Sequence, residues 1–129
     1  MNFELQEGIT HEETKVVGKL DTAKHYGSGN LEVFATPAMV ALMELTALNS
    51  VSVLKKEYGF DTVGIEINVK HVKATALGDT VKCISKLVKI DGRALDFEIE
   101  AFDSEGKIGI CTHKRFVIDP VKFMAKLSN

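Results

Sequence analysis

The segment of residues 37–48 is apolar almost all the way round, and it constrains the fold of this 129-residue chain more than any other feature. It reads Pro-Ala-Met-Val-Ala-Leu-Met-Glu-Leu-Thr-Ala-Leu. A helix that is hydrophobic on every side is normally buried. Glu44 stands in its middle, and a buried carboxylate is costly unless it is paired, hydrogen-bonded or protonated. We therefore expect a buried helix that keeps Glu44 for a function.

The predicted helix has signals at both ends. Thr36 followed by Pro37 favours a helix start, because threonine is a good N-cap and proline suits the first helical position. Two lysines in the last turn and Gly59 just after it favour a helix end. The sequence therefore predicts one long helix over residues 37–57.

Strand-like runs lie on both sides of this helix in the sequence. They cover residues 10–19 before it and residues 62–75, 80–90, 93–103 and 107–118 after it. Asp91-Gly92 has the composition of a two-residue hairpin turn, and residues 103–106 suit a longer hairpin loop. Neighbouring strands are therefore expected to pair antiparallel. Asp119-Pro120 then predicts a short C-terminal helix or tail.

One long apolar helix followed by a meander of strands describes an α+β domain. One flat sheet face cannot cover a helix that is apolar all round. The antiparallel sheet is therefore expected to wrap around the single central helix, which is the hotdog fold. The length predicts one domain over residues 1–129. Such a domain has little room for a closed pocket, so we expect an obligate dimer.

Charge and cysteine spacing exclude several function classes. The net charge of −2, with lysines mixed among the acids, gives no basic stripe, so no nucleic-acid partner is expected. Residues 1–7 do not resemble a leader, and no run approaches the roughly 20 apolar residues of a membrane span. We expect a cytoplasmic protein without a membrane partner. Cys83 and Cys111 are far apart, which favours reduced core thiols.

His71 is the second residue with candidate chemistry. Period-two counting places it on one strand face with Val63, Ile65, Ile67 and Val69, and this apolar face should turn toward the helix. The opposite face is expected to hold Thr62, Gly64, Glu66, Asn68 and Lys70. His71 is therefore expected to point toward the helix side.

Thr36, Glu44 and His71 together form a candidate catalytic constellation. A carboxylate and an imidazole are a usual pair for general acid and base work, so hydrolysis is a natural reaction class. Thr36 and Glu44 are separated by roughly 12 Å of helix, beyond hydrogen-bond reach. Either they contact different parts of the substrate, or two chains contribute to each site. Thr36 could also be only an N-cap, and His71 only a core residue.

Three blocks of the sequence are typical of one family. Residues 33–44 read Val-Phe-Ala-Thr-Pro-Ala-Met-Val-Ala-Leu-Met-Glu, residues 64–71 read Gly-Ile-Glu-Ile-Asn-Val-Lys-His, and residues 112–118 read Thr-His-Lys-Arg-Phe-Val-Ile. These blocks, the first above all, resemble the hotdog-fold thioesterases of the fluoroacetyl-CoA thioesterase type. The resemblance implies hydrolysis of an acyl-CoA thioester in a homodimer, or a tetramer, with sites at the subunit interface.

The resemblance also assigns roles to residues. It implies catalytic roles for Thr36, Glu44 and His71, and substrate contacts for Phe34, Gly64 and Arg115. The Gly64 backbone N–H would contact the oxyanion, and Arg115 would bind the phosphates of CoA. No metal site is proposed, and no cofactor is expected because CoA belongs to the substrate.

The acyl group and the reaction route stay open at this stage. Fluoroacetyl-CoA-specific members carry a longer lid with added aromatic residues, whereas residues 27–30 here read Gly-Ser-Gly-Asn. An ordinary short acyl-CoA is therefore as consistent as fluoroacetyl-CoA, and Glu44 could attack the thioester or activate water. Two other functions stay open. One is a non-catalytic acyl-CoA binding module. The other is an enoyl-CoA hydratase, which is disfavoured because Glu66 should lie on the face opposite His71.

Overall fold

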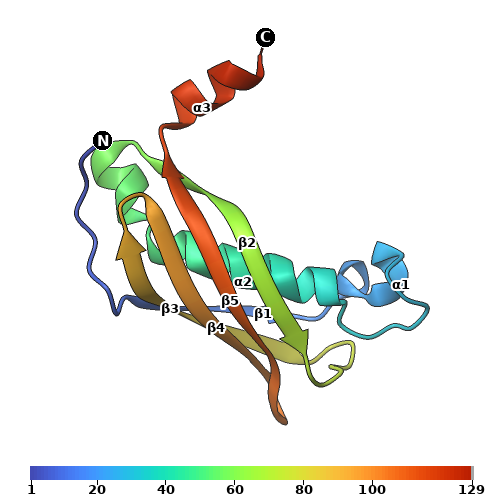
Figure 1. Ribbon diagram of the computed structural model, residues 1–129. Helices are drawn as coiled ribbons and strands as arrows, with labels where there is room; N and C mark the ends of the chain where they lie inside the picture. Colours follow the sequence, from blue (N-terminus) through green and yellow to red (C-terminus); the bar gives the residue numbers. More distant parts are fainter. Residues whose placement is uncertain (129) are drawn as a thin grey trace.

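The computed structural model describes residues 1–128 as one antiparallel sheet with a long helix, α2 (Thr36–Ser50), across one face (Figure 1). The five strands are β1 (Thr10–Val16), β2 (Asp61–His71), β3 (Thr80–Asp91), β4 (Ala94–Asp103) and β5 (Gly106–Ile118). Their order in the sheet is β1-β3-β4-β5-β2, with every neighbouring pair antiparallel. The predicted α+β hotdog architecture is confirmed. No helix within residues 1–128 is long and apolar enough to cross a membrane.

Short helical elements lie before α2 and after β5. A 3-10 turn (Lys19–Asp21) and α1 (Ala23–Tyr26) lie before α2, and α3 (Pro120–Leu127) follows β5. In α3 the Asp119 side chain accepts hydrogen bonds from two backbone N–H groups, so the predicted C-terminal helix start is confirmed. Figure 1 shows α3 extending away from the sheet.

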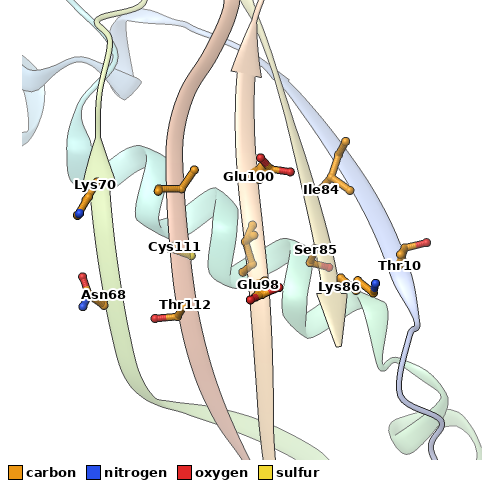
Figure 2. A pocket seen from close by; sticks show the side chains of 12 residues that line it. Thr10, Asn68, Lys70, Ile84, Ser85, Lys86, Glu98, Glu100, Cys111 and Thr112 are labelled. Carbon is orange, nitrogen blue, oxygen red and sulfur yellow. The ribbon is translucent and has the colours of Figure 1, made fainter. Parts of the chain in front are cut away.

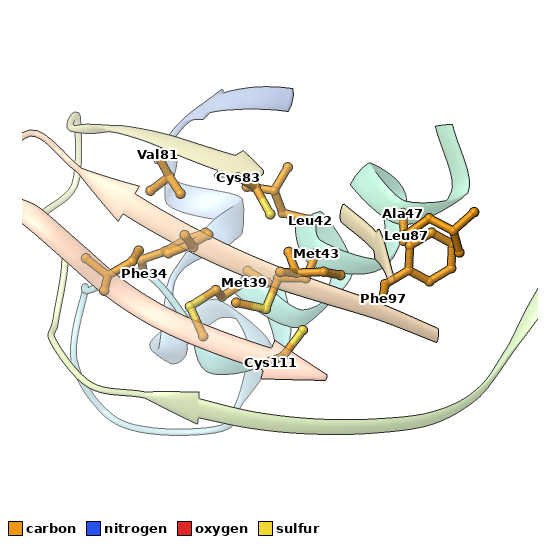
Figure 3. Packing of buried hydrophobic residues seen from close by; sticks show 14 of the residues in the cluster. Phe34, Met39, Leu42, Met43, Ala47, Val81, Cys83, Leu87, Phe97 and Cys111 are labelled. Carbon is orange, nitrogen blue, oxygen red and sulfur yellow. The ribbon is translucent and has the colours of Figure 1, made fainter. Parts of the chain in front are cut away.

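The α2 helix buries one side against the sheet. Figure 3 shows Met39, Met43 and Ala47 of α2 among strand residues such as Leu87 and Phe97, which are all buried. Burying side chains of this size stabilises the domain by about 1.5–3 kcal/mol for each fully buried Leu, Met or Phe. The two cysteines belong to the same core, where burial raises the pKa of Cys83 to about 11 and that of Cys111 to about 12.

The regular helix is shorter than predicted. It ends at Ser50, whose hydroxyl donates to the Ala47 carbonyl, and the β-branched Val51 and Val53 follow. Leu54–Tyr58 then form a separate π-helical turn, which ends at Gly59 with φ 70°. The predicted stop at Gly59 is confirmed, but the single helix over residues 37–57 is not.

The other side of α2 is not covered by the sheet. Leu45 is 43% exposed and the Glu44 side chain is 40% exposed. The prediction of a buried carboxylate is therefore wrong for a single chain, because a five-stranded sheet reaches round only one side of the helix. From the apolar composition of residues 37–48 we expected more of this helix to be buried than one copy of the chain can bury.

A β-bulge in β2 changes which residues face the helix. The register with β5 shifts between Gly64 and Glu66, so Ile65 is the extra residue, and it is 54% exposed. Thr62 is buried before the bulge, and a side chain at Gly64 would contact Glu44 of α2. Period-two counting across an extra residue exchanges the two faces. The predicted inward placement of Ile65 and outward placement of Gly64 are therefore wrong.

The hairpin turns confirm antiparallel pairing with a small change of register. Asp91 pairs with Ala94, so the β3–β4 loop is Gly92-Arg93 rather than Asp91-Gly92. Gly92 has φ 59°, which suits glycine at the first position of a tight hairpin loop. Asp103 pairs with Gly106, so the predicted longer loop after β4 is also a two-residue loop.

Asp103 anchors the segment that follows β2. Its carboxylate accepts hydrogen bonds from Lys73 Nζ at 2.7 Å and from Thr75 Oγ1 at 2.9 Å. The Thr75 carbonyl in turn accepts from the Phe34 backbone N–H at 3.0 Å, just before α2. Burial alone would raise the pKa of Asp103, but its hydrogen bonds and the Lys73 charge lower the pKa to about 2. This carboxylate therefore ties the end of β2 to the start of α2.

We predict that Asp103 stabilises the fold in a pH-dependent way. Its folded-state pKa lies below the unfolded value of about 3.9, so its contribution is complete above that value and is lost as the pH falls toward 2. Asp103→Asn should lower the melting temperature at neutral pH. It should also flatten the loss of stability between about pH 4 and pH 2. Thermal melts across this range test both effects. Asp91→Asn, at an exposed hairpin position, is the control and should change neither.

Candidate active site

The predicted site residues form two groups near opposite ends of β2. The first group joins the start of α2 to the end of β2, where Thr36 Oγ1 lies 2.7 Å from His71 Nδ1. Ala35, not Thr36, is the N-cap residue, and no side chain caps this helix end. The predicted N-cap role of Thr36 is therefore wrong. Its hydroxyl is used for His71 instead, which supports a functional reading of both residues.

His71 sits in a desolvated position with one nitrogen unused. Burial lowers the pKa of His71, and the nearby Lys73 backbone opposes the shift. Its Nε2 atom is buried and has no hydrogen-bond partner within residues 1–128. A buried polar atom without a partner is uncommon. An adjoining cavity of about 340 Å³ is lined by Phe34, Thr36 and His71, among others, so the predicted Phe34 borders the same space.

The second group surrounds Glu44. Its Oε2 atom lies 3.8 Å from Arg115 Nη1, and both atoms lie next to Gly64. A Cβ atom at Gly64 would stand 3.2 Å from Glu44 Oε2, 3.2 Å from His113 Cε1 and 3.5 Å from Arg115 Nη1. The absence of a side chain at Gly64 therefore leaves the Glu44 carboxylate open on this side.

The placement of Arg115 corrects its predicted role. The guanidinium is buried, and it donates from Nε to Thr62 Oγ1 at 2.8 Å and from Nη2 to the Thr62 carbonyl at 2.9 Å. Burial lowers the pKa of Arg115, with Glu44 and Asp61 opposing, and the group stays charged at neutral pH. A cation enclosed in this way is not placed to bind the phosphates of CoA. It lies beside the Glu44 carboxylate instead, with Nη1 3.8 Å from Oε2.

His113 is part of this group, and sequence reasoning assigned it no role. Its Nδ1 atom lies 2.8 Å from the Glu66 carbonyl, and its Nε2 atom lies 3.1 Å from Arg115 Nη1. Burial lowers the pKa of His113, the Glu66 carbonyl opposes this, and the Arg115 charge adds to it. One signal was available: period-two counting puts His113 and Arg115 on the same face of β5, amid apolar neighbours.

One chain does not bring the two groups together. Gly64 and His71 are separated by seven residues of β2, or roughly 23 Å of strand. Along the helix, Thr36 and Glu44 are roughly 12 Å apart, which is also beyond hydrogen-bond reach. Each chain therefore carries two half-sites rather than a complete constellation.

A different cavity lies on the outer face of the sheet and contains none of these residues. It has a volume of about 530 Å³, and its lining includes the exposed side chains of Lys70, Lys86, Glu98 and Glu100 (Figure 2). Glu98 and Glu100 alternate along β4 with the buried Phe97 and Ile99, so they point away from α2. This cavity is therefore separate from the predicted site residues, which lie on the helix side of the sheet.

Both sequence comparisons match this chain to fluoroacetyl-CoA thioesterases. The profile of the fluoroacetyl-CoA-specific thioesterase family matches residues 17–121. The fluoroacetyl-CoA thioesterase of Streptantibioticus cattleyicolor is 40% identical over 96 residues, which are 74% of this chain and 68% of that protein.

Solved structures agree with this assignment. A variant of the fluoroacetyl-CoA-specific thioesterase superposes with a TM-score of 0.86 at 33% identity, over 98% of this chain and 97% of that one. Another variant, in complex with acetyl-CoA, gives a TM-score of 0.88 at 33% identity, over 95% and 96% of the two chains. A hot-dog-like protein from Thermanaerovibrio acidaminovorans, 23% identical, shares the fold with a TM-score of 0.84 over 94% and 89% of the chains. With a profile match over most of its length and a relative at 40% identity, the chain belongs to the fluoroacetyl-CoA-specific thioesterase family.

Proposed function

We propose that this acyl-CoA thioesterase hydrolyses a small acyl-CoA to the free acid and CoA, and that Glu44 carries the reaction. The observation that supports this most is the position of the Glu44 carboxylate. It lies on an otherwise apolar helix, beside a glycine, with the buried Arg115 cation 3.8 Å away. The relative from Streptantibioticus cattleyicolor is a fluoroacetyl-CoA thioesterase, and a variant of the fluoroacetyl-CoA-specific enzyme was solved with acetyl-CoA. Both are small acyl groups.

The active unit in this proposal is a homodimer formed through β2. Among residues 1–128 this strand of 11 residues pairs with β5 alone, so its other edge has no strand partner there. A long free edge is a template for pairing with another chain. The uncovered side of α2, with Leu45 and Glu44, adds apolar surface that one copy does not bury. A two-fold pairing of β2 would use both features at once.

Such pairing would join the two half-sites. An antiparallel pairing centred between Ile67 and Asn68 sets Gly64 of one copy opposite His71 of the other. Glu44 and Gly64 of one copy would then form one active site with Thr36 and His71 of the second copy. The pairing would bring together the two groups that are far apart within one chain. Because the dimer is two-fold symmetric, it would contain two equivalent sites.

The chemistry follows from the groups that this composite site would contain. The thioester carbonyl is held by the Gly64 backbone N–H and the Thr36 hydroxyl, which stabilise the oxyanion as it forms. Glu44 removes a proton from water, or attacks the carbonyl carbon itself to form an acyl anhydride that water then cleaves. In either route the C–S bond breaks, and the CoA thiolate leaves and takes up a proton. His71 is the proton partner of Glu44 in this cycle.

The first functional prediction is that Glu44→Gln removes hydrolysis. The substitution keeps the shape and removes the charge, and one general acid or base group is typically worth about 10²- to 10⁴-fold in rate. Thiol release from acetyl-CoA and other short acyl-CoAs measures the effect. Glu57→Gln, exposed on the following turn, is the matched control and should keep full activity. Near wild-type turnover by Glu44→Gln would rule out this mechanism.

The second prediction separates a catalytic His71 from a structural one. Because burial lowers its pKa, His71 is neutral down to a lower pH than an ordinary histidine, so the acid limb of kcat/KM should lie below about pH 6.5. His71→Asn should lose that limb and most turnover, with the melting temperature within a few degrees. His11→Asn on the distant strand β1 should retain both. A well-folded and fully active His71→Ala enzyme would remove His71 from the mechanism.

The third prediction tests whether two chains build each site. Glu44→Gln and His71→Ala chains should each be inactive alone. Co-refolded in equal amounts they should regain about a quarter of wild-type activity, because half of the dimers are mixed and each mixed dimer has one intact site. Sites confined to single chains would give no recovery. Light scattering should show a mass of twice 14.1 kDa, and a stable, active monomer would contradict the dimer.

A further inference from the structure

The Arg115 guanidinium has only one nitrogen free to meet Glu44. Its Nε and Nη2 atoms both donate to Thr62, at 2.8 and 2.9 Å. These two bonds fix the plane of the guanidinium against β2. Nη1 is the remaining nitrogen, and it lies 3.1 Å from His113 Nε2 and 3.8 Å from Glu44 Oε2. His113 and Glu44 therefore share the same donor atom.

The neighbours of His113 determine its protonation. The Glu66 carbonyl, 2.8 Å from Nδ1, can only accept a hydrogen bond, so Nδ1 carries the hydrogen. The Arg115 N–H groups can only donate, so Nε2, at 3.1 Å, must be the bare acceptor. Two neighbours thus select the same neutral tautomer.

The charges around the ring agree with a neutral His113. The charged groups that face it are Arg115 on the same strand and Glu44 on α2, while the Phe97 ring on β4 is apolar and lies 6.2 Å away. Burial and the Arg115 charge both lower the pKa of His113. A protonated ring would set an N–H group against the N–H groups of Arg115 and break this chain of contacts.

The distance between Arg115 Nη1 and Glu44 Oε2 leaves the carboxylate without a hydrogen bond from this donor. At 3.8 Å the cation attracts the carboxylate but is too far away for a hydrogen bond. A direct hydrogen bond from Nη1 would occupy a carboxylate oxygen that must attack the substrate or accept a proton from water. We propose that His113 is a positioning residue: as a neutral acceptor it holds Nη1 of Arg115 back from Glu44, so that the carboxylate is oriented but remains free to react. This inference rests on the proposed role of Glu44.

The test compares two replacements of His113. His113→Gln supplies an amide oxygen that can still accept a hydrogen bond from Arg115, whereas His113→Leu supplies no acceptor. His113→Leu should reduce kcat by about 10- to 10²-fold with little change in KM, as expected for a misplaced reacting group. His113→Gln should keep kcat within about threefold of wild type. Phe97→Leu, which alters the packing beside the ring, is the control and should lower the melting temperature without reducing kcat.

A double-mutant cycle shows whether His113 acts through Arg115. On an Arg115→Met background, His113→Leu should cause almost no further loss of kcat, because the donor that it controls is gone. Arg115→Ala, which also removes the donor, is the second background if Arg115→Met does not fold. Independent losses that multiply would show that His113 only packs, and would overturn the proposal. Equal losses in His113→Leu and His113→Gln would overturn it as well.

A measurement without turnover gives a separate check. Nitrogen-15 NMR of the His113 ring at neutral pH should show the neutral form with hydrogen on Nδ1. An imidazolium, or hydrogen on Nε2, would overturn the proposal. The outcomes also separate two failures: an active Glu44→Gln enzyme removes the proposed mechanism, whereas an inactive Glu44→Gln with a fully active His113→Leu removes only the role of His113.

Discussion

The incomplete cover of α2 is the constraint on which the rest of this structure depends. The five-stranded sheet buries one side of an almost wholly apolar helix and leaves Glu44 and Leu45 on the other. Exposed apolar surface of this kind favours association, because its burial is the main driving force for it. The free edge of β2 offers backbone hydrogen bonds for the same purpose. The helix that supplies the core thus also supplies the reason for a second copy, and its one carboxylate lies where that copy would arrive.

The bulge at Ile65 lets one strand serve both half-sites. Gly64 and His71 are an odd number of residues apart, so in a regular strand they would point to opposite faces. One extra residue between them restores a common face, and both then turn toward α2. Without the bulge, either Glu44 would meet a different backbone position or Thr36 would lose His71. A local irregularity in the backbone therefore has a direct consequence for the chemistry.

The same irregularity marks the limit of what the sequence could predict. Local rules govern the apolar segment, the turn residues and Gly59. The sequence therefore predicted the helix, the hairpins and the order of elements along the chain. The bulge has no such local signal, so period-two counting failed for residues 62–65, which include the bulge and the residues before it. The exposure of Glu44 depends on how far the sheet reaches, and the burial of Arg115 depends on Thr62 and His113 across two strands. These are properties of tertiary packing, and a pattern along one segment does not contain them.

The two half-sites differ in charge, and their union in the proposed dimer would change both. Thr36 and His71 form a neutral pair in which burial lowers the pKa of the imidazole. Glu44 and Arg115 form a charged pair held slightly apart. A carboxylate brought near His71 favours the protonated imidazole, so it would act against the effect of burial. Assembly would then offset part of the lowering that burial causes, while the His71 pKa stays below its ordinary value of about 6.5. A monomer would lack this adjustment even if each of its residues were correctly placed.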